Sequence, residues 1–190
     1  MLKRILPVFL VMIAALLMLI MTRPATYHVE RSTLIAAPAG GAFELVNNFH
    51  RWAAWSPWGK IDPRMTLTFS GPDSGKGAIY QWVGNKEVGE GKMTILESMP
   101  NEKIEVQLDF IKPFASTSVA TFAFTPAPAG TQVVWSMDGR QSFTTKAISL
   151  FMSMDQAVGK DFEKGLAQLK ALSEGSATAV APGAPDSTRR

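Results

Sequence analysis

Apolar residues recur at steps of three and four over residues 144–172, near the C-terminal end of the chain. The series is Ala147, Phe151, Met154, Val158, Phe162, Leu166 and Leu169, with mostly polar residues between them. This spacing is typical of an α-helix with one apolar face. Because such a helix cannot bury its apolar face alone, we expect a broad apolar partner elsewhere in the chain.

Residues 27–138 follow a different pattern, which predicts that partner. A strand is expected over 27–36, and two short helices follow, the second of which carries Trp52 and Trp55. Six further runs alternate or are rich in β-formers, and Gly, Pro, Asn and Asp separate them. These runs are 65–70, 78–83, 87–98, 104–110, 119–125 and 131–138. Consecutive strands with segregated helices predict an antiparallel sheet in an α+β fold.

The head of the chain predicts a membrane anchor. Residues 5–21 are apolar and uncharged, and as a helix they would span about 26 Å. Thr22 and snorkelling of Arg4 and Arg23 would extend that to a bilayer core of about 30 Å. The alternative is a cleaved signal peptide, but its apolar run is shorter and residues 22–27 form a poor cleavage site. Lys3 and Arg4 outweigh Arg23, which predicts a cytoplasmic N-terminus and a domain on the outer or periplasmic side.

Composition narrows the remaining possibilities. The chain has 190 residues, so an anchor over 1–24 leaves one domain over 25–172 and a Pro-, Gly- and Ser-rich tail over 173–190, expected to be disordered. Of the 19 Lys and Arg residues, 16 follow residue 24 and balance 16 Asp and Glu. The sequence contains no basic stripe of the kind that binds nucleic acid, so we do not expect nucleic-acid binding. Cysteine is absent, and neither His28 nor His50 has neighbours at metal-ligand spacing, so we expect no metal and no cofactor.

Four segments resemble a known superfamily. They are 35–38 with Phe43, the tryptophan-rich stretch 51–58, the turn 71–78 leading to Trp82, and 154–166. Together they resemble the START-like, or SRPBCC, superfamily (polyketide cyclase/dehydrase-like), in a membrane-anchored bacterial-type form. The resemblance implies the helix-grip fold, in which a curved antiparallel sheet wraps around a long C-terminal helix and leaves a cavity. It also implies that members bind lipids, sterols, polyketides or hormones, and that a minority are enzymes.

Large apolar side chains are the expected lining of that cavity. Rigid rings and adaptable methionines suit an apolar ligand, although the same residues could fill a solid core. Gly159 and Gly165 lie inside the predicted helix and either allow close packing or leave room for a ligand. The candidate ligand-binding residues are Trp55, Trp58, Trp82, Phe110, Trp135, Met137, Phe151 and Met154.

Catalytic candidates are few. Asp155 follows Met154, and a carboxylate buried there would have a raised pKa and could act as an acid or base. Glu90, Asp109, Arg140 and Asp155 are all candidates for a polar group at a pocket, but the solvated surface is the favoured position for each of the four. The leading hypothesis is a membrane-anchored module that binds a small apolar or amphipathic ligand, either a lipid or a polyketide-like molecule. The alternatives are an enzyme of the cyclase or dehydrase type and an envelope interaction protein with a filled core. No sequence feature indicates an oligomeric state.

Overall fold

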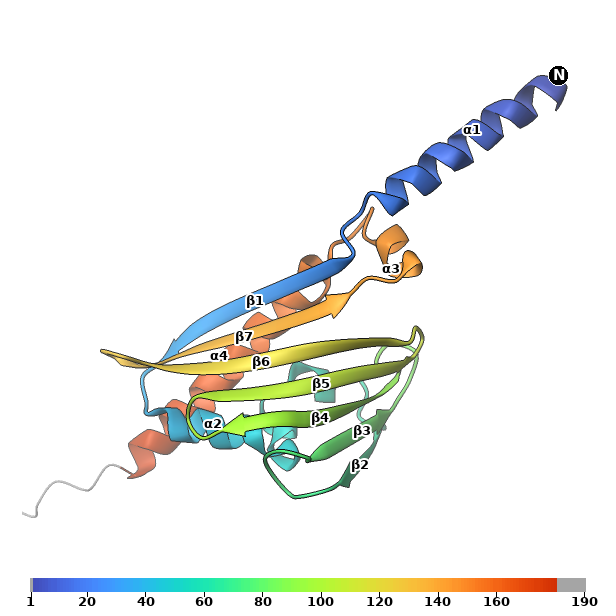
Figure 1. The fold of residues 1–190 in the computed structure, drawn as a ribbon. Helices are drawn as coiled ribbons and strands as arrows, with labels where there is room; N and C mark the ends of the chain where they lie inside the picture. Colours follow the sequence, from blue (N-terminus) through green and yellow to red (C-terminus); the bar gives the residue numbers. More distant parts are fainter. Residues whose placement is uncertain (1, 181–190) are drawn as a thin grey trace, which may run out of the picture.

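The computed structural model describes residues 2–180, and within them the side chains of residues 7–59 and 61–177. Seven strands form one antiparallel sheet in the order β1-β7-β6-β5-β4-β3-β2 (Figure 1). The prediction of an α+β fold with one opening strand and six later ones is confirmed. The strands are β1 (Thr26–Ile35), β2 (Thr66–Ser70), β3 (Ile79–Val83), β4 (Glu90–Met99), β5 (Lys103–Lys112), β6 (Ser116–Ala127) and β7 (Gly130–Arg140).

Helices precede, interrupt and follow the strands. Helix α4 lies along the sheet and packs mainly against β1 and α2, as Figure 1 shows. This arrangement, a single antiparallel sheet with a C-terminal helix against it, is consistent with the helix-grip fold. The helices are α1 (Leu2–Met21), α2 (Ala39–Asn47), the 3-10 turns η1 (Phe49–Ala54) and η2 (Pro57–Lys60), α3 (Phe143–Ile148) and α4 (Met154–Val180).

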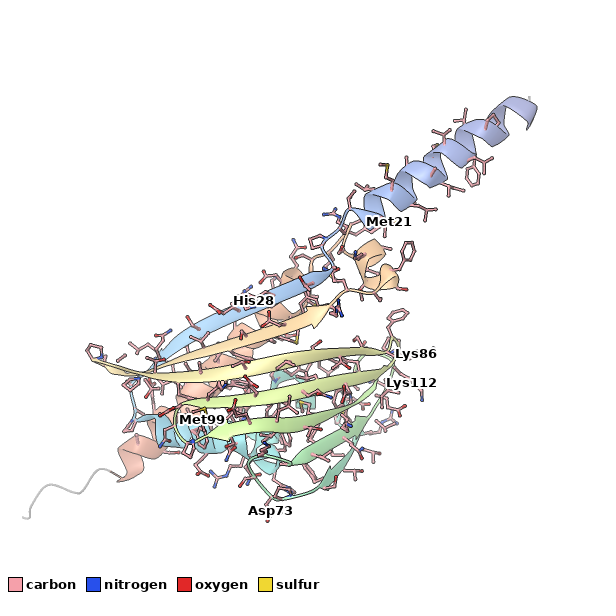
Figure 2. The ribbon with its side chains drawn as sticks, viewed as in Figure 1. Met21, His28, Asp73, Lys86, Met99 and Lys112 are labelled. Atoms are coloured by element: carbon pink, nitrogen blue, oxygen red, sulfur yellow. The ribbon has the colours of Figure 1, made fainter. Side chains whose placement is uncertain are left out.

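The sheet has two distinct ends. At the α1 end, β1 begins and β7 ends, since Thr26 pairs with Arg140. The turns β3–β4 and β5–β6 lie at this same end, where Figure 2 labels Lys86 and Lys112. At the opposite, α2 end lie the turns β4–β5, near Met99, and β6–β7. We call the face that carries Val29, Val106 and Met137 the inner face, because these side chains are buried in the core.

The predicted single helix over 144–172 is wrong in one respect, because the structure divides it. Helix α3 ends at Ile148 and α4 begins at Met154. A reciprocal cap starts α4: the Gln156 N–H donates to Ser153 Oγ (3.1 Å) and the Ser153 N–H donates to Gln156 Oε1 (3.0 Å). This capping box satisfies two amides that would otherwise lack acceptors, so it favours a new helix start in the middle of an apolar period.

Helix α4 also extends further than the sequence predicted. It continues to Val180, so residues 173–180 are helical rather than part of a disordered tail. Ser173 is buried and donates its hydroxyl to Leu169 O at 2.7 Å. Residues 181–190 lie outside the described residues.

Helix α1 projects away from the sheet (Figure 1). Of its described side chains, from residue 7 onward, Ile20 is the only buried one. Within the part of the chain that the structure describes, no helix meets the length and apolarity needed to cross a bilayer. Lys3 and Arg4, on which the predicted orientation depends, lie outside the described side chains.

Candidate functional site

The half of the inner face nearer the α2 end is filled by aromatic rings, and we call it the packed half. The rings of Trp135 and Phe162 stack with their centroids 4.0 Å apart. The ring of Phe122 also stacks on Trp135, with a centroid distance of 4.8 Å. Trp55 meets Phe122 and Trp135 edge-on. Such offset and edge-to-face contacts add to the burial energy of each ring. This half therefore contains a close-packed core.

The half nearer the α1 end, which we call the open half, is built differently. Several of its inward positions carry small residues, so other side chains can approach the backbone of the sheet. These positions are Gly91, Ser116, Ser118, Ala120 and Gly139. Two rings lie directly on the glycines, because a Cβ at Gly91 would come within 2.4 Å of Trp82 and one at Gly139 within 2.5 Å of Tyr27. The small residues thus admit large side chains that approach the backbone from above.

Half-buried apolar side chains surround these positions. They come from η2, from the residue before β2, from strands β3 and β5, and from the first two turns of α4. All of them pack against the buried core. They are Trp58, Met65, Tyr80, Leu108, Phe110, Met154 and Val158. Exposure falls along α4, since Met154 and Val158 are half-buried whereas Phe162, Leu166 and Leu169 are buried. The open half therefore presents apolar surface that its own chain covers only in part.

The inward-facing polar groups on the strands of the open half include two phenols, of Tyr27 and Tyr80, and the hydroxyl of Ser118. The Tyr27 hydroxyl and Ser118 Oγ lie 2.7 Å apart in a hydrogen bond, and Ser118 is buried. Burial raises the pKa of Tyr27 and likewise that of Tyr80. Because a raised phenol pKa keeps the proton on the oxygen, both tyrosines are neutral near pH 7 and can offer an O–H to a partner rather than take up a proton.

The indole N–H of Trp135 lies at the boundary between the two halves. The side chain is 2% exposed, and its Nε1 finds no hydrogen-bond acceptor among the described residues. Trp52, Trp55 and Trp82 differ, because each donates to a backbone carbonyl at 2.8–3.1 Å. A buried donor without an acceptor costs about 1–3 kcal/mol. Such a group in a native fold calls for an explanation, and an acceptor from outside the chain is one.

Asp155 lies on the solvated surface, which is the position that the sequence favoured, and not in the buried environment that a catalytic acid or base there would need. Its carboxylate is exposed and accepts two hydrogen bonds from the Arg31 guanidinium, at 2.7 and 3.0 Å. The hydrogen bond from Arg31 lowers the pKa of Asp155, opposite to the predicted direction. Arg31 also donates to Glu163 at 2.8 Å. The candidate catalytic residue is instead one of two carboxylates that fix α4 to β1.

The two helical glycines allow close packing. A Cβ at Gly159 would lie 2.2 Å from the Arg31 guanidinium, and one at Gly165 would lie 2.8 Å from the Trp135 ring. Side chains of this chain occupy the space that glycine leaves at both positions. The first of the two interpretations from the sequence is therefore correct, and neither glycine makes room for a ligand.

Six of the eight predicted ligand-binding residues lie at the open half or at its boundary. These are Trp58, Trp82, Phe110, Trp135, Met137 and Met154. Trp55 does not belong there, because it is fully buried in the packed half and its indole donates to Leu45 O. Phe151 is also misplaced: it lies between α3 and α4 and is 91% exposed. The capping box at Ser153 removes it from the apolar face of α4.

Two hollows stand out in the described part of the chain, and neither is lined by a residue of α4. One hollow, of about 170 Å³, is lined by η1 and the β2–β3 hairpin, where His50 stacks on Phe69. The other, of about 520 Å³, lies at the α1 end of β1, β7 and β6. Its lining includes the outward-facing His28 and Asp138 and also Tyr27, Ser118 and Gly139 of the open half. The aromatic stack around Trp135 fills the space beneath the middle of α4.

The remaining polar candidates lie outside the apolar surface of the open half. Glu90 pairs with Lys112. Burial by itself would raise the pKa of Asp109, but hydrogen bonds from Gln107 and Thr117 and the charge of Lys92 lower it overall. The hydrogen bond to Asp138 raises the pKa of His28. No group of three potential metal ligands gathers anywhere in the described part of the chain.

Sequence reasoning missed Tyr27, Tyr80, Leu108 and Ser118 as site residues. The parity of the strands could have identified two of them. Leu108 shares the alternation of Val106 and Phe110, and Ser118 shares that of Ala120 and Phe122. The position of Tyr27 over Gly139 depends on pairing between the first and last strands, which are distant in sequence. No local pattern encodes that contact.

A match to a family model shows the family to which the chain belongs. The model described as "Polyketide cyclase / dehydrase and lipid transport" matches residues 26–174. The chain belongs to this family. The match begins with β1 and ends in α4, so it covers the whole sheet and both halves of the inner face.

Solved structures show the same fold at low identity. Protein CV1439 from Chromobacterium violaceum is 17% identical with a TM-score of 0.54, over 80% of this chain and 99% of that one. Protein MLL2253 from Mesorhizobium loti is also 17% identical, with a TM-score of 0.56, over 77% and 96%. The di-domain ARO/CYC StfQ of the steffimycin biosynthetic pathway is 12% identical with a TM-score of 0.59, over 81% of this chain and 52% of that one. No curated protein matches the chain.

Proposed function

We propose that this protein is a membrane-tethered module that binds a small apolar or amphipathic molecule, either a lipid or a polyketide-like compound, against the open half of its inner face. The observation that carries the proposal is the group of half-buried apolar side chains around the small residues of that half. Membership of a family described by polyketide cyclisation and lipid transport supports this class of ligand.

The energetics favour an apolar ligand that also carries an acceptor. Covering about 200 Å² of apolar surface would contribute about 5 kcal/mol, at about 25 cal/mol per Å², before the costs of association. The unpaired Trp135 N–H and the Tyr80 hydroxyl, kept protonated by its raised pKa, are the donors at hand. A ligand with a carbonyl, carboxyl or hydroxyl oxygen near one end would meet both requirements.

The groups present favour binding over acid–base catalysis. Among the described residues, the inward-facing titratable side chains on the strands of the open half are Tyr27 and Tyr80, and both are neutral near pH 7. The carboxylate predicted as an acid or base, Asp155, is ion-paired with Arg31. A dehydration needs a group that can take up a proton, and these phenols are poor at that task.

We also propose that α1 tethers the domain to a bilayer. Its described side chains are exposed and apolar, with Ile20 as the exception. An apolar helix without a polar face is stable only if protein or lipid covers it. Tethering would hold the domain, on the outer or periplasmic side, beside the phase into which an apolar ligand partitions.

A second candidate function is that of an interaction protein with a filled core. The stacked rings of Trp135, Phe122 and Phe162 favour it, because they fill the space beneath the middle of α4. In that case the open half would be ordinary surface at the edge of a solid core.

One pair of variants separates these functions. Val158→Trp adds a large ring at the open half, whereas Ala157→Trp adds the same ring on the exposed side of α4. The full chain of each variant is purified in nanodiscs and examined by native mass spectrometry and solvent extraction. We expect an apolar molecule to accompany the wild type and Ala157→Trp, and its occupancy to fall at least tenfold in Val158→Trp. Equal occupancy in all three proteins, or none in any, contradicts the proposal.

A further inference from the structure

We propose that the segment linking the sheet to α4 is a membrane-docking surface that rests in the interface of an anionic lipid bilayer. This surface consists of the exposed apolar residues Phe143, Ile148, Phe151 and Met152. The inference rests on the tether of the proposed function, and it adds a second contact with the membrane, made by the folded domain itself.

Exposure on this segment is unusual for a folded domain. Phe151 is 91% exposed, and the other three side chains of the docking surface are also exposed. Single exposed apolar residues need no explanation, but a cluster within ten residues marks an interaction site. At the same end of the sheet, Ile111 and Phe114 of the β5–β6 turn are exposed too.

Backbone contacts fix this surface next to α1. The Gln141 N–H donates to Ala25 O at 2.8 Å, so the start of α3 is joined to the chain just after α1. Ala25 lies four residues beyond the end of α1 at Met21, a reach of at most about 14 Å. Helices α1 and α3 also contact each other directly. A bilayer that takes up α1 would therefore lie against the docking surface.

The charges around the surface fit anionic headgroups. Arg23, Arg140 and Lys146 lie in the two segments 7–29 and 139–153 that form this region. The acidic residues that flank these segments, Glu30, Asp138 and Asp155, are paired with His28 or Arg31. None of the three cations forms an ion pair within the described residues. Basic residues beside an inserted helix are attracted to a negatively charged leaflet. A second copy of this chain would offer the same positive charge and would be repelled.

The absence of cysteine permits a clean test with single-cysteine variants of the full chain. Phe151→Cys reports on the docking surface, Met12→Cys on α1, and Ser74→Cys on the exposed β2–β3 turn at the opposite end of the sheet. Each is labelled with an NBD fluorophore in vesicles containing 30% phosphatidylglycerol. Quenching by lipids that carry a doxyl group near the headgroup is then measured, and circular dichroism checks the fold.

We expect the label at position 151 to be quenched at least threefold more than the label at position 74, and Lys146→Gln to reduce that difference. If the label at 151 behaves like that at 74 while the label at 12 is quenched, the docking surface is refuted and the tether stands. A label at 151 that is shielded from water but not quenched by lipid indicates a protein partner and also refutes it. Ligand occupancy, measured separately, reports on the proposed function whichever result is found.

Discussion

The two halves of the inner face belong to one sheet and one helix, yet they are built from different residue types. In the packed half, Phe122, Trp135 and Phe162 stack on one another and are almost fully buried. In the open half, the strands carry glycine, serine and alanine at inward positions, and the surrounding apolar side chains are half-buried. The same antiparallel framework thus supports a solid core at one end and an uncovered apolar surface at the other.

The difference shows where stability and binding reside in this fold. Rings that are packed on all sides stabilise the fold, and they have no exposed apolar surface that a ligand could cover. Half-buried side chains retain apolar area that a ligand can cover. We infer that the packed half fixes the shape of the sheet and α4, so that the open half is presented in a constant geometry.

The largest expected effect is a difference in the free energy of unfolding when one phenylalanine is replaced in each half. Phe162→Ala should lower the free energy of unfolding by about 3–5 kcal/mol, because it leaves a cavity in a close-packed stack. Phe110→Ala should cost only about 1–2 kcal/mol, because the ring is half-buried. Chemical denaturation of the full-length variants in the same detergent measures both. Equal losses would remove the distinction between the halves.

Loss of the α4 cap should loosen the open half alone. Ser153→Ala removes the hydroxyl that accepts from Gln156, at a cost of about 1 kcal/mol. Hydrogen exchange should accelerate over residues 154–158 and stay unchanged over 162–169, which the packed half holds. Thr144→Ala, at an exposed position of α3, is the matched control. Faster exchange along the whole of α4 would show that the helix moves as a single unit.

Trp135→Phe tests the boundary between the halves. It keeps an aromatic ring in the stack and removes the unpaired N–H, so the two effects should nearly cancel and stability should change by less than about 1 kcal/mol. The wild type should prefer 2-naphthol over naphthalene, and the variant should lose about two- to tenfold of that preference. Isothermal titration in nanodiscs measures both affinities. A preference that is unchanged would exclude the indole as a ligand donor.

Acidification gives the smallest effect. Arg31 lowers the pKa of Asp155 in the folded protein, so this ion pair stabilises the fold above the usual carboxyl pKa of about 3.9. That contribution is lost as the pH falls through the lowered folded-state pKa. We expect the start of α4 to loosen in the wild type only below the usual carboxyl pKa, and Arg31→Met to show a weaker pH dependence. Methyl NMR of Met154 follows the change; identical profiles would exclude the ion pair.

The sequence predicted the features that depend on local periodicity. Alternation at Ile104, Val106, Leu108 and Phe110 located β5 and its inner face correctly. The helical period of Val158, Phe162, Leu166 and Leu169 identified the buried side of α4. These patterns suffice for an α+β fold because each element shows its buried face in its own residues.

Features that depend on competition between contacts were not predicted. The period through Phe151 and Met154 continued the helix, but the Ser153–Gln156 cap divided it. Asp155 looked available for chemistry until β1 brought Arg31 beside it. Trp55 could have lined a site or filled the core, and only the tertiary packing shows that it fills the core. Volume and pairing between distant strands have no signature in a local sequence window.

The most direct test of the account is a map of where an apolar probe binds. The full chain, labelled at its ten methionine methyl groups, is titrated in nanodiscs with 2-naphthol and followed by methyl NMR. We predict shifts for Met65, Met93, Met137 and Met154, which lie at the open half, and none for Met99 at the α2 end of the sheet. Shifts confined to Met99, or no saturable shift at the four methionines of the open half, would contradict the claim that this half is the binding surface.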